Sequence, residues 1–310
     1  MTSPQTTVLL LGAGELGTAF LPHLSTLPNT HITIGIRSPP KYTHLQSANI
    51  SLTAIDLSSP SPSLAKSFSA YDILISATGF GADPSSVLKL AEEALVAGKI
   101  RKEQWKGKLW FFPWQWGVDY DVIGDGQGMM PLFGAQRDVR NLLRQKAEAS
   151  NVKWTVVSTG IFMSFLFEQF WGIVDRSKEE EGKVVVRCLI DWNHKVTVTD
   201  VNDIGRVLAR VVAGDVEAED RVLYIAGDTI SYGQLVDIVK RVSGKQVEQE
   251  AWGLEHLKNE LDSAPGDGIK KYRLVFARDG VWWEMSGTVN KALSMDMMDV
   301  ETFAKSLFSR

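Results

Sequence analysis

The stretch VLLLGAGELGTAF, residues 8–20, constrains the fold of this chain more than any other. Its first four residues are apolar and predict a strand buried on both faces, and its last residues begin a helix. Between them Gly12 permits a tight turn, Gly14 lets a pyrophosphate approach the backbone, and Gly17 lets the helix pack against the strand. This order predicts a dinucleotide site with phosphate at the helix start. A glycine turn without a ligand is the alternative.

The residues that end the second predicted strand indicate which dinucleotide binds. The strand covers 31–36 and ends at Arg37, roughly 20 residues after Gly17, where such folds place the residue that reads the ribose. An acidic residue there selects NAD, whereas an arginine accommodates the 2′-phosphate of NADP. Arg37, Ser38 and Lys41 suit a phosphate, so we predict NADP(H), with a solvated surface arginine as the alternative. Glu15 and Leu16 lie within the glycine turn and complete the predicted cofactor site.

Further strands and helices alternate along the first half of the chain. The strands are predicted at 49–57, 71–77, 109–113 and 152–158, the helices at 86–98 and 131–150, a Ser/Pro loop at 58–63 and a solvated polar connection at 99–108. This alternation predicts an α/β fold with a Rossmann-type doubly wound parallel sheet. The last residue of the fourth strand and the three that follow it would let the cofactor approach; they are Ala77, Thr78, Gly79 and Phe80.

The second half is less regular. It predicts strands at 183–190, 197–199 and 221–226, and helices at 201–213, 231–242, 255–261 and 300–308. We expect residues 1–158, with 196–226 returning, to form the NADP-binding Rossmann domain. Residues 159–195 and 227–310 then form a smaller α+β substrate lobe, with the substrate in the cleft between the two.

Several classes of function find no support in the composition. The net charge of −4 argues against a nucleic-acid surface. The longest apolar stretch, 160–174, is broken by Glu168 and Gln169, so we expect no membrane span. Cys188 is the only cysteine and the N-terminus carries no basic leader, which leads us to expect a cytoplasmic protein. The histidines show no ligand spacing, so we expect no metal site.

The motifs GAGELG, ISATG, FFPWQWGVD, TVVSTGIF and VTVTDVNDIGRV, in this order, resemble the NmrA-like and isoflavone reductase-like family of atypical short-chain dehydrogenases, and most of all its fungal members. The resemblance implies NADPH at the glycine turn and nicotinamide at the ends of the fifth and sixth strands. The residues at these ends are Pro113, Trp114, Gln115, Thr159, Gly160, Ile161 and Phe162. The candidate walls of a substrate pocket are Trp116, Phe165, Phe167 and Trp282, joined by Trp283; core packing is the alternative for these aromatic residues.

One position departs from the family pattern. The family's reductases carry a catalytic lysine three residues after a phenylalanine, and here Gln136 follows Phe133 at that spacing. A glutamine can form hydrogen bonds but cannot donate a proton at neutral pH. The Tyr-x-x-x-Lys pair of common short-chain dehydrogenases is missing as well. We therefore expect Gln136 to hold a substrate oxygen or a water rather than to act as a general acid.

The resemblance implies an NADPH-dependent reductase that transfers hydride to a carbonyl, an enone or a benzylic carbon of a small aromatic or conjugated secondary metabolite. Two alternatives stay open. One is a dinucleotide-sensing regulator without turnover, and the other is a non-redox isomerase or cyclase on the same fold. The expected partner is a small-molecule substrate, with no nucleic acid and no membrane, and the expected assembly is a monomer or homodimer.

Overall fold

The computed structural model describes residues 5–78 and 83–308. Its contacts divide the chain into two compact units. The first unit contains the residues up to Trp116, Ala135–Val157 and Ile204–Leu223. The second contains Gly117–Gly134, Ser158–Asp203 and the residues from Tyr224 onward. The predicted residues Gly79 and Phe80 lie outside the described residues.

A seven-stranded sheet organises the first unit, and its strands stand in the order β11-β6-β5-β4-β1-β2-β3. Val8 of β1 pairs in parallel with Ile32 of β2 on one side and with Ile73 of β4 on the other, so the strand order reverses beside β1. This reversal is the switch point of a doubly wound sheet. The strands are β1 Thr6–Leu11, β2 Thr30–Ile36, β3 Ile50–Ala54, β4 Ile73–Ser76, β5 Leu109–Phe112, β6 Val152–Ser158 and β11 Arg221–Tyr224.

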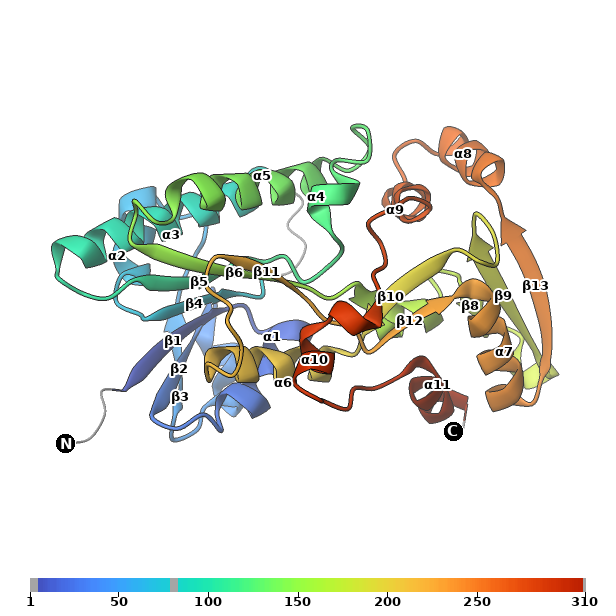
Figure 1. Cartoon of the computed structure of the whole chain (residues 1–310), viewed down its shortest axis with the longest axis horizontal. Helices are drawn as coiled ribbons and strands as arrows, with labels where there is room; N and C mark the ends of the chain where they lie inside the picture. Colours follow the sequence, from blue (N-terminus) through green and yellow to red (C-terminus); the bar gives the residue numbers. More distant parts are fainter. Residues whose placement is uncertain (1–4, 79–82, 309–310) are drawn as a thin grey trace. The chain divides into compact units, whose positions relative to one another are not determined.

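Helices cover both faces of this sheet, which confirms the predicted Rossmann-type fold. In Figure 1, α2, α3 and α5 lie on one face, and α1 and α6 lie on the other. Leu9 and Leu11 of β1 share a buried cluster with Phe68 of α2, Ala94 of α3 and Leu143 of α5. Because strand side chains alternate, the buried residues between them face the opposite layer. The helices are α1 Glu15–Leu24, α2 Ser61–Phe68, α3 Ser85–Glu103, α5 Pro131–Lys146 and α6 Val201–Val212.

Two predictions for the connections of this unit are wrong. The predicted Ser/Pro loop at 58–63 gives way to α2 at Ser61, because Pro62 lies in the first helical turn, where a proline's missing N–H is no loss and its fixed φ suits the helix. The predicted connection at 99–108 is helical as far as Glu103. The reason is Arg101, which is only 3 % exposed and is anchored inside the unit rather than solvated.

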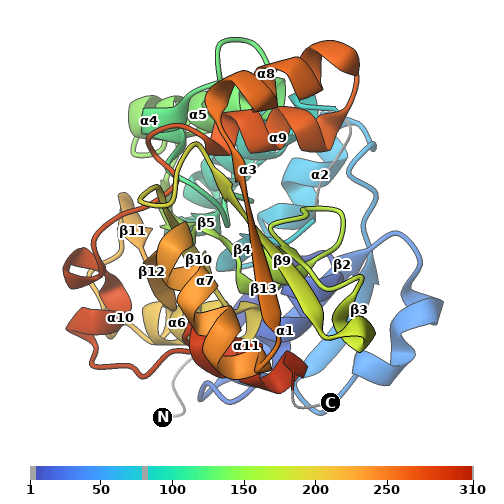
Figure 2. The ribbon, with the colours of Figure 1, turned by 90° about the vertical axis from the view of Figure 1, so that its right-hand side faces the viewer.

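The second unit is built on two small sheets. One has the strand order β12-β10-β7 and the other the order β13-β9-β8. Figure 2 shows β13 lying along β9, with α7 beside β13 and the pair of helices α8 and α9 beyond its end. The strands are β7 Ile161–Phe162, β8 Val174–Asp175, β9 Lys183–Leu189, β10 Lys195–Thr199, β12 Asp228–Ser231 and β13 Gln246–Trp252. The helices are α4 Tyr120–Ile123, α7 Tyr232–Ser243, α8 Leu254–Ser263, α9 Gly268–Phe276, α10 Val289–Ala292 and α11 Val300–Phe308.

Local sequence explains some of these elements and not others. Helix α7 begins at a capping box, in which Ser231 accepts from the Gln234 N–H and the Gln234 side chain accepts from the Ser231 N–H. The sequence does not predict strand β13, because most of its side chains are exposed and the strand therefore has no alternating apolar pattern. Its pairing with β9 runs from Gln246 opposite Lys183 to Trp252 opposite Leu189. Among the described residues, no helix combines the length and apolarity that crossing a bilayer requires.

Candidate functional site

The glycine turn has the geometry that a dinucleotide site requires. Gly12 has φ +97°, and a Cβ there would lie 2.6 Å from the Ala77 carbonyl oxygen. A Cβ on Gly17 would collide with the Gly12 carbonyl oxygen. At Gly14, by contrast, a Cβ would meet nothing within 4 Å. Two of the glycines are therefore required by the protein's own packing, while the third borders open space.

The start of α1 supplies donors beside this space. Gly14 is the N-cap, and it has no side chain to accept from the first-turn amides of the helix. Residues 15–17 form this turn, and Glu15 is exposed whereas Leu16 is buried. Amides at a helix N-terminus and the positive end of its dipole favour an anion. The residues present thus fit a pyrophosphate at the position of Gly14.

The residues predicted to read the ribose phosphate follow β2 and are exposed. These are Arg37, Ser38 and Lys41. Within the described residues Arg37 forms no ion pair or side-chain hydrogen bond, so its guanidinium is available to a ligand. The Asp56 carboxyl is nearby, and its pKa is lowered. The main cause is the hydrogen bonds from Ser58, and the charge of Arg37 makes a smaller contribution. After β4, Ala77 is buried and Thr78 is exposed.

A network of buried hydrogen bonds, formed largely by amide side chains, links the residues just after β5 to helix α5. The Gln115 side chain donates to the Gln136 backbone oxygen over 2.8 Å, and the Gln136 side chain donates to the Trp114 oxygen over 2.7 Å. Arg140 Nε donates to Gln115 Oε1 over 2.7 Å. Gln136 is 1 % exposed, and its Oε1 has no hydrogen-bond partner among the described residues. The structure thus places Gln136 beneath the 113–115 turn and links it to that turn.

The predicted aromatic pocket residues lie in different environments. Trp116 is buried in the first unit, where its Nε1 donates to the Ser76 oxygen and its ring packs edge-on against Phe20. In the second unit Phe165 packs between Phe162 and Phe170. Phe167 packs on Phe303 of α11. Trp116 is therefore a core residue, whereas Phe165 and Phe167 are partly buried against the core of the second unit.

The turn after β6 is fixed within the second unit. Thr159 N–H donates to the Gly117 oxygen, and Thr199 Oγ1 donates to the Thr159 oxygen. Gly160 has φ +70°, and a Cβ there would collide with the Thr197 oxygen. Ile161 pairs with Val198 in the β7–β10 ladder.

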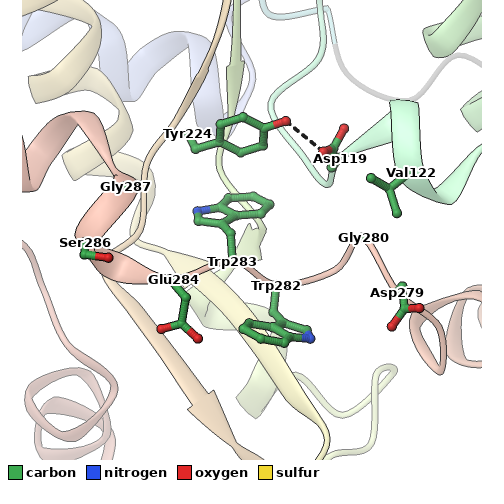
Figure 3. A pocket seen from close by; sticks show the side chains of 10 residues that line it. All are labelled: Asp119, Val122, Tyr224, Asp279, Gly280, Trp282, Trp283, Glu284, Ser286 and Gly287. Atoms are coloured by element: carbon green, nitrogen blue, oxygen red, sulfur yellow. Dashed lines mark hydrogen bonds between the residues drawn. The ribbon is translucent and has the colours of Figure 1, made fainter.

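A pocket of about 500 Å³ opens in the second unit, and Trp282 and Trp283 are the predicted pocket residues that line it. Figure 3 shows Tyr224 above Trp283, with their rings 5.1 Å apart, and the Tyr224 hydroxyl donating to Asp119 over 2.7 Å. The lining residues are Asp119, Val122, Tyr224, Asp279, Gly280, Trp282, Trp283, Glu284, Ser286 and Gly287.

Sequence reasoning missed most of this pocket. Its walls come from three segments, at 119–122, at 224 and at 279–287, that no local motif connects. The signal visible in the sequence is the adjacent pair Trp282 and Trp283, whose rings are candidate pocket walls. Within the described chain no group of three or more histidine, cysteine or acidic residues is placed to hold a metal ion.

Known proteins share the sequence pattern and the fold of this chain. The NmrA-like family profile matches residues 4–303. An NmrA-like family domain-containing oxidoreductase of Gibberella moniliformis is 36 % identical over 97 % of this chain and 97 % of that protein. Solved structures of pinoresinol-lariciresinol and phenylcoumaran benzylic ether reductases give a TM-score of 0.76 at 18 % identity, covering 98 % of this chain and 99 % of theirs. The Escherichia coli NADPH-dependent quinone oxidoreductase, complexed with NADPH, gives 0.73 at 18 % identity over 97 % and 99 %. The chain belongs to the NmrA-like family, as its motifs indicated.

Proposed function

We propose that this protein is an NADPH-dependent oxidoreductase that reduces a small aromatic or conjugated metabolite. The open space at Gly14, beside uncapped helix amides, is the observation that carries the proposal. The Gibberella relative is named an oxidoreductase, and the quinone oxidoreductase of the same fold holds NADPH. The first supports an oxidoreductase and the second supports NADP(H) as its cofactor.

In this proposal the chain's own residues bind and orient the cofactor. The α1 amides receive the pyrophosphate, and Arg37 and Ser38 receive the 2′-phosphate through charge-assisted hydrogen bonds. The buried network of Gln115, Gln136 and Arg140 holds the turn after β5 in one conformation. When bound, NADPH supplies the hydride, and the protein supplies position and a shielded environment.

Gln136 favours a second candidate, a dinucleotide-binding regulator without turnover. Its amide is buried and donates its hydrogen bond to the Trp114 oxygen, and a glutamine cannot transfer a proton as a general acid at neutral pH. A panel of quinones and enones, followed through NADPH absorbance, separates the two. Steady consumption supports the reductase, whereas tight NADPH binding with no consumption of any acceptor supports the regulator.

Replacing Arg37 tests the choice of cofactor. Loss of a charge-assisted hydrogen bond costs about 1.5–3 kcal/mol. We therefore expect Arg37→Ala to weaken NADPH binding roughly tenfold or more and to leave NADH binding nearly unchanged. Calorimetric titration with both dinucleotides measures this. Equal losses for NADPH and NADH would show that Arg37 does not contact the 2′-phosphate.

Replacing Gln136 tests its role in turnover. If Gln136 only positions the turn, Gln136→Ala removes one neutral hydrogen bond, worth about 0.5–1.5 kcal/mol, and kcat with an accepted substrate should fall by roughly tenfold or less. Removing a general acid would instead cost roughly 10²–10⁴-fold. A loss beyond roughly a thousandfold, with folding and NADPH affinity intact, would contradict a passive role.

A further inference from the structure

The segment that follows β2 carries a sequence pattern that binding of a cofactor does not require. Ser38 is followed by Pro39 and, three positions after the serine, by Lys41. Proline-directed protein kinases select a serine before a proline and favour a basic side chain at this spacing, as kinases commonly read charge patterns. The chain has four Ser-Pro pairs, which begin at Ser3, Ser38, Ser59 and Ser61. Only the pair at Ser38 has a lysine or arginine three positions after the serine.

The structure leaves the Ser38 hydroxyl accessible. Ser38 is exposed and directly precedes the 3-10 helix η1, Pro39–Leu45. Its side chain does not cap this helix, and its hydroxyl has no hydrogen-bond partner among the described residues. The hydroxyl is therefore free to react with a second protein at this surface.

The segment can also be drawn into the active site of a kinase, which takes up its substrate as an extended chain. No residue of η1 is buried, and the helix is interrupted at Tyr42, whose φ of −123° is not helical. Pro39 and Pro40 have no N–H, so the first N–H that the helix can bond is that of Lys41, which donates to the Ser38 oxygen over 3.2 Å. A segment with few backbone hydrogen bonds and no buried side chain opens locally at little cost.

We propose that Ser38 is the phosphorylation site of a proline-directed protein kinase and that its phosphorylation prevents NADPH from binding. In this reaction the Ser38 Oγ attacks the γ-phosphorus of the ATP that the kinase holds. The Oγ–P bond forms as the bond from this phosphorus to the β–γ bridging oxygen breaks, ADP leaves, and the hydroxyl proton passes to the catalytic aspartate of the kinase. The effect on NADPH rests on the proposed function of Arg37.

The modification places an anion beside the cations proposed to receive the 2′-phosphate of NADPH. A phosphoserine carries about −1.5 to −2 charges at pH 7 and three strong acceptor oxygens. Arg37 directly precedes Ser38, is exposed, and forms no ion pair within the described chain. Its guanidinium and the Lys41 ammonium would pair with the phosphoserine, which competes as a tethered ligand, and the added charge would repel the 2′-phosphate. NADH has no 2′-phosphate and is spared this competition.

Treatment with a purified proline-directed kinase and ATP tests the site. We expect peptide mass spectrometry to find phosphate on Ser38, and Lys41→Ala to slow its incorporation several-fold. Ser61→Ala is the matched control, because Ser61 is exposed and precedes a proline, but the residue three positions on is the buried Leu64. This variant should be phosphorylated at Ser38 as fast as the unchanged protein. Absence of phosphate from Ser38, while the same kinase modifies a Ser-Pro-x-Lys peptide, would refute the site.

Calorimetric titration before and after complete phosphorylation tests the consequence. We expect NADPH affinity to fall roughly tenfold or more, at least as far as in Arg37→Ala, and NADH affinity to change by less than about twofold. Kinase treatment of Ser38→Ala should leave the NADPH affinity of that variant at its untreated value. Unchanged NADPH affinity, equal losses for the two dinucleotides, or a loss in treated Ser38→Ala would overturn the consequence. If the unmodified protein binds neither dinucleotide, the proposed function fails, whereas mass spectrometry still decides the site.

Discussion

Gly14→Val is expected to abolish dinucleotide binding while leaving the protein folded. Gly14 has φ −80° and ψ −166°, an extended conformation that valine adopts readily, and its Cβ would meet no protein atom within 4 Å. The side chain would instead fill the space proposed for the pyrophosphate. We expect NADPH affinity to fall by more than roughly a hundredfold, about 2.8 kcal/mol, in calorimetric titration.

Two other glycines provide the controls for this experiment. Gly253 is the N-cap of α8 with φ −62° and ψ 168°, and a Cβ there also meets nothing within 4 Å. Gly253→Val therefore matches the Gly14 change in backbone and crowding, and should bind NADPH normally. Gly17→Val places its Cβ against the Gly12 oxygen and should lower thermal stability instead. Normal NADPH binding by Gly14→Val would show that the glycine turn serves the fold alone.

Arg101→Ala is expected to destabilise the protein by about 3 kcal/mol, because the hydrogen bonds of a buried guanidinium are lost and hydrogen bonds to a charged group contribute about 1.5–3 kcal/mol. The Arg101 guanidinium donates to the oxygens of Gly107, Ser69 and Tyr71 and to the Asp72 carboxylate. It thereby joins the end of α3 to the segment that leads into β4. Denaturant unfolding measures the change.

The neighbouring Lys102 is exposed and gives the matched control. Lys102→Ala should change the unfolding free energy by less than about 0.5 kcal/mol. Arg101→Lys should recover only part of the stability, because an ammonium cannot reproduce the planar array of donors. Comparable unfolding free energies for Arg101→Ala and Lys102→Ala would contradict the anchoring role.

The ion pair of Arg101 with Asp72 also makes the stability of the Arg101→Ala variant depend on pH in a different way from that of the unchanged protein. Burial raises the pKa of Asp72, but hydrogen bonds from Thr7 and Arg101 outweigh it and hold the pKa below its ordinary value. Stability from Asp72 is therefore present above the unfolded pKa and is lost as pH falls through the lower folded pKa. In Arg101→Ala the folded pKa moves up, so less of this stability is present at neutral pH.

The sequence alone determined the fold class and the place of the glycine turn after β1. Local signals are enough for both, because an apolar strand, a glycine turn and a helix occupy consecutive residues. The positive φ of Gly12 belongs to the turn itself, and Gly17 approaches the Gly12 oxygen within that short stretch. The same holds for α7, whose cap is encoded within four residues. The family motifs extended the predicted fold to the rest of the chain, and the family profile, which matches residues 4–303, confirmed the family.

Only the tertiary structure decided which polar and aromatic residues are buried and which border a pocket. Arg101 and Gln136 are polar in sequence, yet each is buried because distant carbonyl oxygens satisfy its donors. Trp116 and Trp282 are the same residue type, yet one packs in a core and the other lines a pocket. Such outcomes depend on contacts between segments far apart in the chain, which no periodicity or spacing along the sequence encodes.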